Sequence, residues 1–486
     1  MAEPLTVVVL AAGGGTRMRS KTMKVLHRIG GRSMIGHVLA AVAATEPARV
    51  VAVVGHQREQ VGPHILDLLP QAVLAVQEEQ LGTGHAVRVA LEALAEVPGG
   101  APSGTVLVAY GDTPLLEGAS LRAFAADHEA GQRAVSILSG IVEDPTGYGR
   151  IVRDGEGEVA AIVEQKDATP EQREIREINS GILAFDAAFL LEAIHRLGND
   201  NAGGEYYLTD LVGLARDAGL IVGAFVLDDV VQTEGANDRV QLAALGRELN
   251  DRILRRWMRE GVTIVDPQTT WIDADVTLAR DVTVLPGTQL LGTTVVAEDA
   301  VLGPDTTLAD CEVGVAASVV RTHAQLAVIG DAASIGPFSY LRPGTVVGAG
   351  GKVGAYVETK NAQLGAGAKV PHLSYVGDAE IGEGANIGAG TIVANYDGVE
   401  KHRTVVGRHA RVGSNNTLVA PVVIGDGAST GGGTVVRGEV PSGALAVSAG
   451  PLRIIAGWVR RRREGTAQAA AVTEPAVASA AEHRSS

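Results

Sequence analysis

The chain has 486 residues, a length that suits two or three domains better than a single core. Its formal net charge of −15 argues against a nucleic-acid-binding protein, which would usually carry a basic face, but leaves anionic small ligands possible. The single cysteine, Cys311, cannot form an intramolecular disulfide and fits a reducing compartment.

The first residues contain a short apolar run with no basic segment before it, so no signal peptide is expected. We find no stretch of about 18 uncharged apolar residues with membrane composition. These features predict a cytoplasmic protein that has neither membrane nor nucleic-acid partners.

The first half of the chain alternates between strand and helix patterns. Compact apolar runs at Leu5–Leu10, 50–54 and Thr105–Tyr110 predict buried strands, and segments 33–44 and 84–97 predict helices. Such alternation predicts an α/β, Rossmann-like sheet with helices on both faces. The segment Arg239–Arg259 then has apolar residues at steps of three and four, namely Leu242, Leu245, Leu249, Ile253 and Trp257. We interpret it as an amphipathic helix that connects two domains.

From about residue 262 an internal repeat begins. Aliphatic residues recur at steps of six, in the series Val284, Leu290, Val296, Leu302, Leu308; Ile329, Ile335, Leu341, Val347, Val353; Leu364, Val370, Val376; Ile381, Ile387, Val393; and Val406, Val412, Leu418, Ile424. A period of six indicates one flat face of a prism per hexapeptide, with three hexapeptides in each triangular coil. Stacked coils would bury a continuous aliphatic column, so this pattern predicts a left-handed parallel β-helix.

Two segments depart from the hexapeptide period. Residues 394–401 are polar and should form a loop that leaves the prism, whereas residues 464–486 are rich in small residues and should be disordered. The predicted domains are therefore residues 1–238, a helical linker 239–260, a β-helix 261–457 and a tail 458–486 that is first basic and then of low complexity.

A glycine-rich loop follows the first predicted strand. Glycines at this position let backbone N–H groups approach a phosphate, and Arg17 and Lys24 would add positive charge. Taken alone, the loop could equally be an ordinary α/β turn and Lys24 a solvated surface lysine. Asp112 follows the strand Thr105–Tyr110, at the edge of the sheet where α/β proteins bind ligands, although a turn or helix cap would also explain it.

Taken together, these motifs resemble those of the sugar-1-phosphate nucleotidyltransferases. The sequence LAAGGGTRM is followed by KVLH, and further family motifs occur in the family's order at Gln77, 80–85, 110–112, 145–150, 162–165, 177–181, 205–210 and 235–237. The resemblance is closest to the bifunctional members that also acetylate glucosamine-1-phosphate, and it covers roughly residues 5–457. It implies synthesis of UDP-N-acetylglucosamine, which feeds peptidoglycan and other cell-envelope precursors.

The resemblance also implies roles for individual residues in the uridylyl transfer. Arg17 and Lys24 would stabilise the triphosphate charge, and Asp112 with Asn237 would hold Mg²⁺. The residues implied to bind UTP or the UDP-sugar are Leu10, Ala11, Ala12, Gly13, Lys24, Gln77, Gly82, Thr83, Tyr110, Gly111, Asp112, Gly149, Glu164, Asn179 and Asn237. Met23 replaces a proline common in the family, which should affect loop rigidity only.

Polar residues also concentrate on neighbouring coils of the predicted prism. Acetyl transfer from acetyl-CoA to an amine needs a base, and histidine suits that task near neutral pH. The resemblance implies that His372 is this base, with Glu358 orienting it, although a lone histidine is more often structural. It further implies glucosamine-1-phosphate binding by Arg342, Lys360, Tyr375 and Asn386, and acetyl-CoA binding by Ala389, Asn395, Tyr396, Ser414 and Gly432.

Two positions differ from the family pattern around acetyl-CoA. Gly432 replaces an alanine, which a backbone contact would tolerate, and Ala449 replaces an arginine that some members use for the CoA phosphates. We hypothesise that Trp458 and Arg460–Arg463 supply this contact instead; a solvated basic run is the alternative.

Three functional hypotheses follow from the sequence. The first is the bifunctional enzyme, and the second is a uridyltransferase whose β-helix serves as a scaffold. A scaffold would not need the set of His372, Lys360, Tyr375 and Asn395. The third, a non-catalytic β-helix binding protein, is disfavoured by the ordered N-terminal motifs. Similar prisms form trimeric acyltransferases, which implies a homotrimer with the acetyl site between subunits.

Overall fold

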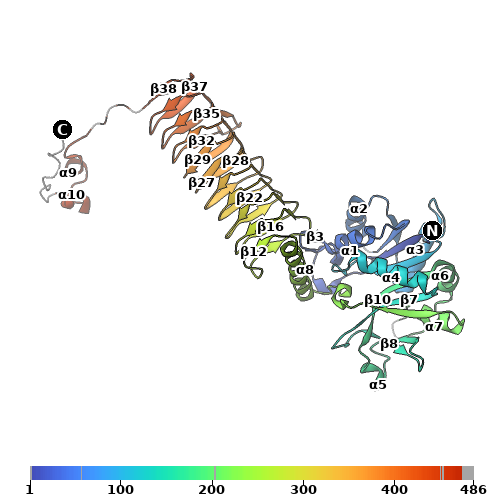
Figure 1. The fold of residues 1–486 in the computed structure, drawn as a ribbon. Helices are drawn as coiled ribbons and strands as arrows, with labels where there is room; N and C mark the ends of the chain where they lie inside the picture. Colours follow the sequence, from blue (N-terminus) through green and yellow to red (C-terminus); the bar gives the residue numbers. More distant parts are fainter. Residues whose placement is uncertain are drawn as a thin grey trace. The chain divides into compact units, whose positions relative to one another are not determined.

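The computed structural model describes residues 3–55, 57–201, 204–448, 450, 452 and 454–472. It divides into two compact units, Met1–Gly351 and Lys352–Ser486. The first unit contains a mixed β-sheet with helices, followed by coils of a β-helix, and the second contains β-helix coils and two short helices (Figure 1). The predicted domain boundaries at residues 238, 260 and 457 remain predictions.

A nine-stranded sheet forms the N-terminal part of the first unit. Its central order is β11 (Val222–Val226), β7 (Val135–Ile141), β10 (Glu177–Asp186), β6 (Thr105–Tyr110), β1 (Leu5–Leu10), β4 (Arg49–Val54) and β5 (Val73–Val76). Strands β1, β4, β5 and β6 are parallel, whereas β10 is antiparallel to its neighbours. The strands β8 (Gly149–Arg153) and β9 (Val159–Val163) extend the sheet beside β10.

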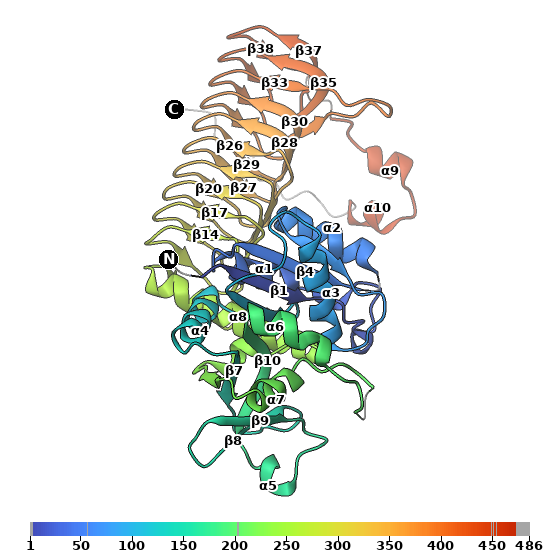
Figure 2. The same cartoon turned by 90° about the vertical axis from the view of Figure 1, so that its right-hand side faces the viewer.

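Successive residues of β1 point to opposite faces of this sheet, and each face has its own apolar core. Val8 belongs to the core that covers one face, together with apolar residues of α3 (Thr83–Ala95), α6 (Ala187–Ala193) and α7 (Asp210–Asp217). Val7 and Val9 belong to the other core, with α1 (Met34–Ala43), α2 (Arg58–Leu68) and α4 (Gly118–Ala130). Figure 2 shows helices on both sides of β1 and β4. The predicted Rossmann-like sheet, with its apolar strands and covering helices, is confirmed.

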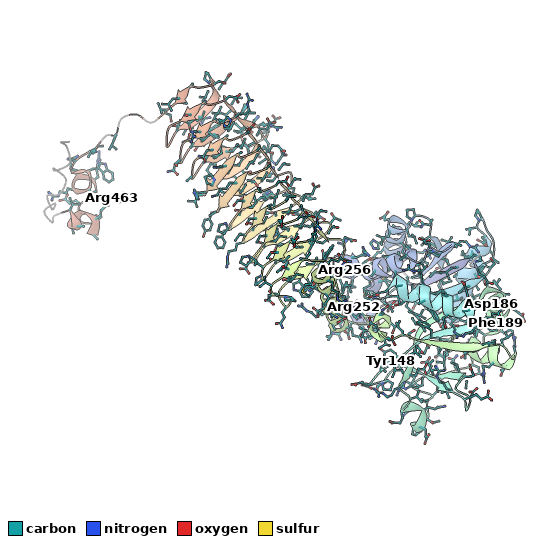
Figure 3. The ribbon with its side chains drawn as sticks, in the orientation of Figure 1. Tyr148, Asp186, Phe189, Arg252, Arg256 and Arg463 are labelled. Atoms are coloured by element: carbon teal, nitrogen blue, oxygen red, sulfur yellow. The ribbon has the colours of Figure 1, made fainter. Side chains whose placement is uncertain are left out.

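Helix ends in this sheet domain are capped by side chains that their sequences supply. Ser33 caps α1 by accepting a hydrogen bond from the Gly36 backbone N–H at 3.0 Å, and the carboxylate of Asp186 caps α6 by accepting from the Phe189 N–H at 2.8 Å (Figure 3). The remaining short elements are η1 (Thr16–Met18), η2 (Lys24–Leu26), β2 (Arg28–Ile29), β3 (Arg32–Ser33), α5 (Pro170–Arg173), η3 (Ile194–Arg196) and η4 (Val230–Thr233).

Helix α8 (Arg239–Arg259) follows the sheet and confirms the predicted amphipathic helix. Its first turn is capped by Asp238, whose carboxylate accepts from the N–H groups of Val240 and Gln241, both at 2.9 Å. Leu245, Ile253 and Trp257, which lie on one side of the helix, are buried.

After α8 the first unit continues as three stacks of short parallel strands. One stack contains β12 (Thr263–Ile264), β15 (Thr283–Val284), β18 (Val301–Leu302), β21 (Ser318–Val319) and β24 (Ser334–Ile335). The second contains β13 (Trp271–Ile272), β16 (Gln289–Leu291), β19 (Thr307–Ala309), β22 (Thr322–Gln325) and β25 (Ser339–Leu341). The third contains β14 (Thr277–Leu278), β17 (Val295–Val296), β20 (Glu312–Val313), β23 (Val328–Ile329) and β26 (Val346–Val347). Three parallel stacks with short connections form a triangular prism.

The second unit contains further coils of the same kind. One stack contains β27 (Lys352–Ala355), β29 (Lys369–His372), β31 (Asn386–Ile387), β34 (Arg411–Val412), β36 (Ser429–Thr430) and β38 (Leu445–Ala446). The other faces are made by β28 (Glu358–Leu364), β30 (Tyr375–Ile381), β32 (Ile392–Ala394), β33 (Thr404–Val406), β35 (Thr417–Ile424) and β37 (Val435–Val440). Between β32 and β33 the chain leaves the period, and an isolated antiparallel bridge joins Tyr396 to Lys401, which confirms the predicted loop.

The hexapeptide period accounts for the core of both prism segments. Every aliphatic residue of the predicted series has at most 3% of its surface exposed. Glycines follow many of these residues because the next coil comes very close. A Cβ on Gly330 would lie 2.8 Å from the Val347 carbonyl oxygen, and a Cβ on Gly354 would overlap the Pro371 carbonyl oxygen. The predicted left-handed parallel β-helix is confirmed.

The tail contains α9 (Trp458–Arg462) and α10 (Ala467–Ala471). Helix α10 lies in the segment for which disorder was expected; Thr466 caps it by accepting from the Ala469 N–H at 3.3 Å, and alanine favours helix. Residues 473–486 lie outside the described part of the chain. Among the described residues, no helix is long and apolar enough to cross a membrane.

Candidate functional site

A cavity of about 290 Å³ opens at the carboxyl ends of β1, β5 and β6 in the first unit. Parallel strands of an α/β sheet place ligand-binding loops at this edge. Of the residues implied to bind UTP, the cavity is lined by Leu10, Ala11, Ala12, Gly13, Lys24, Gln77, Gly82, Thr83, Tyr110 and Asp112. Ten of the fifteen residues in the sequence-predicted set therefore line one cavity, although they are spread from β1 to the residues that follow β6.

Glycines shape the walls of this cavity. Gly15 has a φ of 55°, and a Cβ there would lie 2.5 Å from Lys24 Cβ, so the glycine-rich loop packs directly on the lysine stem. Gly82 has a φ of 107°, and a Cβ there would lie 2.6 Å from the Tyr206 carbonyl oxygen. The Gln80 side chain donates a hydrogen bond to the Ala12 carbonyl and so ties the two loops together.

Lys24 is the central cation of the cavity. Its ammonium forms an ion pair with the Asp112 carboxylate and donates a hydrogen bond to Asn237 Oδ1 at 2.8 Å. Both lysine and aspartate side chains are largely shielded from solvent, with 12% and 21% exposed. The structure thus brings together three predicted residues from distant parts of the chain.

The backbone near Asn237 is packed closely against Asp112. The Ala236 N–H donates to the Asp112 carbonyl at 3.3 Å, and a Cβ on Gly235 would lie 3.2 Å from the Asp112 carboxylate. The Asn237 N–H in turn donates to the Gln241 side chain at 2.7 Å. Helix α8 therefore holds the segment that carries Asn237.

Asp112 and Asn237 offer a carboxylate and an amide oxygen, which are hard donors that suit Mg²⁺. That both oxygens contact the Lys24 ammonium indicates a point where positive charge is favoured. Among the described residues, no group of three or more His, Cys, Asp or Glu side chains is arranged to hold a metal ion. Mg²⁺ commonly keeps waters and phosphate oxygens as its other ligands, so a set of two protein oxygens fits it.

A second group, outside the lining of the cavity, contains Gly149 on β8, Glu164 directly after β9 and Asn179 on β10. Gly149 pairs with Asn179 in the antiparallel register, and a Cβ on Gly149 would lie 3.3 Å from Glu164 Oε1. Burial raises the pKa of Glu164, and the charges of Asp167 and Asp210 add to that effect.

Tyr110 connects this group with the cavity. Burial, together with the charges of Asp112 and Glu164, raises the pKa of Tyr110 to about 12, so its hydroxyl stays protonated. Gly111 is buried and its N–H donates to the Leu10 carbonyl at 2.9 Å, which places it in the strand junction. Arg17 lies on η1, is exposed and does not line the cavity.

In the second unit, His372 begins a column of equivalent positions on successive coils. The Gly390 N–H donates to the His372 carbonyl at 3.3 Å, the Asn415 N–H to the Ala389 carbonyl at 2.7 Å, and the Gly433 N–H to the Ser414 carbonyl at 2.8 Å. These bonds align His372, Ala389, Ser414 and Gly432 along one corner of the prism. The His372 side chain is exposed. The predicted base and three predicted acetyl-CoA contacts therefore lie in one line.

A polar cluster occupies a second corner, around Asp378. Its carboxylate accepts from Asn361 Nδ2 at 2.9 Å and from Asn395 Nδ2, and Lys360 Nζ lies 3.7 Å away. The Tyr375 hydroxyl lies over Gly377, where a Cβ would meet it. Lys360, Tyr375 and Asn395 thus lie near one another, although the resemblance implied sugar-phosphate binding for the first two and acetyl-CoA binding for Asn395.

The remaining residues predicted for the acetyl transfer lie outside the His372 column and the Asp378 cluster. Tyr396 is 59% exposed in the loop after β32, and its hydroxyl donates to the Gly398 carbonyl at 2.6 Å. Asn386 lies on β31, in register with Lys369. Glu358 lies on β28, opposite Tyr375 of β30. Arg342 follows β25 in the other compact unit, and Ala449 lies outside the described residues.

Comparison with known proteins adds a family. Residues 7–169 match a MobA-like NTP transferase domain. Proteins called "Bifunctional protein GlmU" match nearly the whole chain: that of Pseudarthrobacter chlorophenolicus is 56% identical over 96% of this chain and 94% of its own, and that of Rhodococcus jostii 58% over 96% and 94%. The protein of the same name from Nocardia farcinica is 54% identical over 100% of this chain and 98% of its own.

The chain belongs to the bifunctional GlmU family. It is therefore a bifunctional transferase that carries a nucleotidyltransferase domain. The predicted resemblance is confirmed. A solved structure titled as a putative glucose-1-phosphate thymidylyltransferase from Bacillus anthracis also matches half of the chain, with 19% identity and a TM-score of 0.40.

The structure of this GlmU family member also reveals residues to which the sequence assigned no role. Val25, Gln80, Ala86 and Glu205 complete the lining of the cavity, and Gln80 and Glu205 stand inside family motifs quoted above. Asp378 is the centre of the polar cluster, yet no motif singled it out. Its signal in the sequence is positional, because the coil register aligns it with Asn361 and Asn395.

Proposed function

We propose that this enzyme makes UDP-N-acetylglucosamine in two steps and that the two predicted residue sets carry one step each. Glucosamine-1-phosphate is first acetylated by acetyl-CoA, and N-acetylglucosamine-1-phosphate is then uridylylated by UTP. This proposal rests on the finding that the chain matches bifunctional GlmU proteins over nearly all of its length. The product would feed peptidoglycan and other envelope precursors, and we propose a cytoplasmic location.

In the uridylyl transfer, a phosphate oxygen of the sugar attacks the α-phosphorus of UTP. A new P–O bond forms, the bond to the β-phosphate bridge breaks, and pyrophosphate leaves. The protein must neutralise charge and hold the reactants in line. Leu10–Gly13, Gln77, Gly82 and Thr83 would bind the uridine part, while Arg17 and Lys24 would face the phosphates. Gly149, Glu164 and Asn179 would hold the sugar, with Tyr110 and Gly111 between the two groups.

We propose Mg²⁺ as the metal, held by Asp112 and Asn237. When bound, it would neutralise the phosphate oxygens. Lys24 already contacts both oxygen donors, so the arrival of a nucleotide and a cation would free the ammonium for the phosphates. Asp112 then serves to keep Lys24 in place before the substrate binds.

In the acetyl transfer, the sugar amine attacks the thioester carbonyl. A C–N bond forms, the C–S bond breaks, and CoA leaves as the thiol. His372, which we propose as the base, accepts the proton that the ammonium must lose. Glu358 would help orient His372, and Arg342, Lys360, Tyr375 and Asn386 would bind the sugar phosphate. Acetyl-CoA would lie along Ala389, Ser414 and Gly432, with Asn395 and Tyr396 beside it.

The tail and the assembly complete the proposal. Arg463, labelled in the tail in Figure 3, lies over the Trp458 ring with Cζ 5.2 Å from its centroid. Trp458 and Arg460–Arg463 would contact the CoA phosphates in place of the arginine absent at Ala449. Truncation after Gly457 should then raise the KM for acetyl-CoA; an unchanged KM would dismiss this role. We also propose a homotrimer, in which the acetyl site lies between subunits and the uridyl site does not.

The deciding experiment is thiol release from acetyl-CoA on addition of glucosamine-1-phosphate, without UTP, by the wild type and His372→Ala. We expect release by the wild type and a loss of roughly 10²–10⁴-fold in the variant, with pyrophosphate release from UTP and N-acetylglucosamine-1-phosphate retained. If an intact oligomeric wild type releases no thiol, the alternative of a uridyltransferase with a structural β-helix replaces this proposal.

A further inference from the structure

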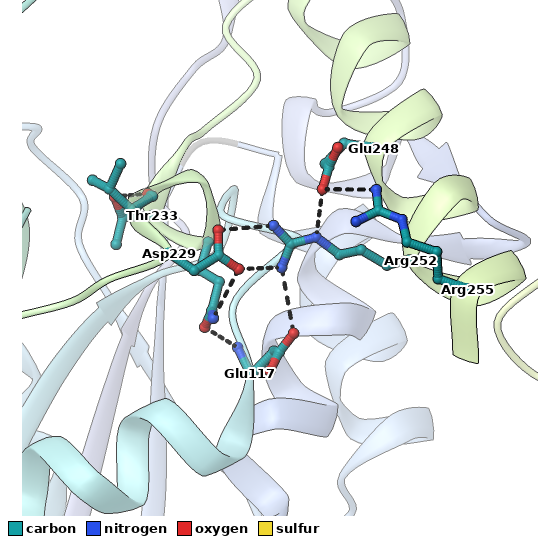
Figure 4. A network of polar contacts seen from close by, with 8 residues as sticks. Glu117, Asp229, Thr233, Glu248, Arg252 and Arg255 are labelled. Atoms are coloured by element: carbon teal, nitrogen blue, oxygen red, sulfur yellow. Dashed lines mark hydrogen bonds and ion pairs between the residues drawn. The ribbon is translucent and has the colours of Figure 1, made fainter. Parts of the chain in front are cut away.

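Arg252 forms the best-connected ion-pair network among the described residues of the first unit (Figure 4). Its guanidinium meets Asp229 in a two-point contact, with Nη1 at 2.8 Å from Oδ2 and Nη2 at 3.1 Å from Oδ1. Nη1 also lies 3.3 Å from Glu117 Oε1, and Nε donates to Glu248 Oε1 at 2.9 Å. The arginine side chain is 19% exposed, so these contacts are partly shielded from solvent.

The three carboxylates come from different parts of the chain. Glu248 is on α8 itself, one turn before Arg252. Glu117 is the residue before α4, five positions after Asp112, and Asp229 precedes η4, eight positions before Asn237. Arg252 therefore joins the segment that follows Asp112 to the segment that leads to Asn237.

Further hydrogen bonds connect these two segments beside the arginine. The Glu117 N–H donates to Gln232 Oε1 at 3.2 Å, and Gln232 Nε2 donates to Asp229 Oδ2 at 3.3 Å. Gln232 is buried, with 5% of its surface exposed. The two segments meet again at the other end, where the Ala236 N–H donates to the Asp112 carbonyl. They thus form a closed loop of contacts, fixed to α8 by Arg252 at one end and by the Gln241 bond to Asn237 at the other.

Apolar packing alone would not fix the relative orientation of these two segments. Leu115 and Ala236 pack with Leu245 of α8 in a small buried cluster, which brings the segments together but specifies direction weakly. A planar guanidinium that meets two carboxylates at once fixes both distance and orientation.

We infer that Arg252 is a positioning residue for the uridylyl transfer, which sets the spacing of Asp112 and Asn237 by clamping Glu117 and Asp229. The inference rests on the proposed metal-binding role of Asp112 and Asn237. Partners outside the ligand shell typically change metal affinity or activity by about 10–100-fold when they are lost.

The test measures Mn²⁺ binding in the presence of UTP by electron paramagnetic resonance, alongside the Mg²⁺ dependence of pyrophosphate release. For Arg252→Met we expect the Mn²⁺ dissociation constant and the half-saturating Mg²⁺ to rise together by about tenfold, while thiol release is unchanged. Arg252→Lys should show the same direction, because one ammonium cannot replace a two-point contact. Glu117→Gln and Asp229→Asn should each reproduce part of the effect.

Two controls separate the clamp from general effects of charge. Glu248→Gln removes a contact within α8. Arg255→Met removes a positive charge from the same helix, where Arg255 Nη2 lies 3.9 Å from Glu248 Oε1. Both should bind Mn²⁺ as the wild type does. If Arg252→Lys, or a folded Arg252→Met, also binds Mn²⁺ like the wild type, the arginine is structural only and the inference is overturned; if Arg252→Met does not fold, Arg252→Lys decides.

Asp112→Asn distinguishes this inference from the proposal beneath it. Loss of Mn²⁺ binding in Asp112→Asn with normal binding in the Arg252 variants would overturn the clamp and leave the metal site standing. Normal Mn²⁺ binding in Asp112→Asn would overturn the metal site, and with it the inference.

Discussion

The two candidate sites are built in different ways. The nucleotide cavity collects residues from loops at the ends of several strands, and its key contacts join Lys24 to Asp112 and Asn237 across most of the N-terminal sequence. The proposed acetyl site instead uses equivalent positions on successive coils, such as His372, Ala389 and Ser414. The first depends on how distant segments pack, whereas the second depends on a local repeat. Perturbations should therefore affect the two halves separately.

The largest separation is expected from Asp112→Asn. An amide cannot neutralise Lys24, so uridylyl transfer should fall roughly 10²–10³-fold while acetyl transfer is unchanged. Pyrophosphate and thiol release measured on one preparation check this. Asp127→Asn, which removes the partner of Arg133 away from the cavity, is the matched control and should leave both rates intact. Equal loss of both reactions in Asp112→Asn would contradict separate sites.

Acidification should also separate the two regions. Burial lowers the pKa of His128 from 6.5 to about 4, and burial likewise lowers the pKa values of His27, His37 and His64, all in the first unit. Because the unfolded chain binds the proton more readily, the stabilisation from neutral His128 is full above pH 6.5. It declines by about 1.4 kcal/mol per pH unit toward pH 4, or about 3 kcal/mol in total.

This pH effect can be measured through thermal inactivation of each half-reaction at pH 7 and pH 5. Uridylyl transfer should be lost at a lower temperature at pH 5, and His128→Gln should flatten that dependence, since glutamine can still bond Ser136 but does not titrate. An unaltered pH slope in His128→Gln would assign the effect to other groups.

A steric change in the second unit should instead reduce acetyl transfer and leave uridylyl transfer unchanged. Gly354→Ala would force a Cβ into the Pro371 carbonyl of the next coil and should destabilise the second unit by about 1–3 kcal/mol. Gly367→Ala has open space around its Cβ but a φ of 64°, and should cost about 1 kcal/mol. Denaturant unfolding followed by thiol release compares the two; equal losses would mean that coil spacing adapts more than the close contact suggests.

The smallest effect is expected at the polar cluster. In Asp378→Asn the amide cannot accept from Asn361 and Asn395 at once, and Lys360 loses its charged neighbour. The KM for glucosamine-1-phosphate should rise about tenfold, and by more than the KM for acetyl-CoA, with little change in kcat. Steady-state thiol release gives all three values, and a change confined to the KM for acetyl-CoA would place Asp378 in the other subsite.

The contrast between the regions also explains what sequence reasoning could predict. The hexapeptide period specifies both inward direction and coil register, so the buried series follows from counting, whereas the residues of the column from His372 came from the family resemblance. In the N-terminal sheet, periodicity predicts strands and helices, but family motifs were needed to join Lys24 with Asn237. Neither route finds Arg252, because its partners Glu117 and Asp229 come together only through tertiary packing. Asp378 was missed for a simpler reason: the repeat was counted for aliphatic residues and not for polar ones.

The corner that runs from His372 through Ala389 and Ser414 to Gly432 has a regular spacing along the prism axis, because it carries one of these residues per coil. Adjacent strands lie about 4.8 Å apart, so His372 and Gly432, three coils apart, are separated by roughly 14 Å along the prism axis. The axial length of this corner can change only in whole coils, because a partial insertion either turns the inward aliphatic residues outward or, like residues 394–401, leaves the prism as a loop.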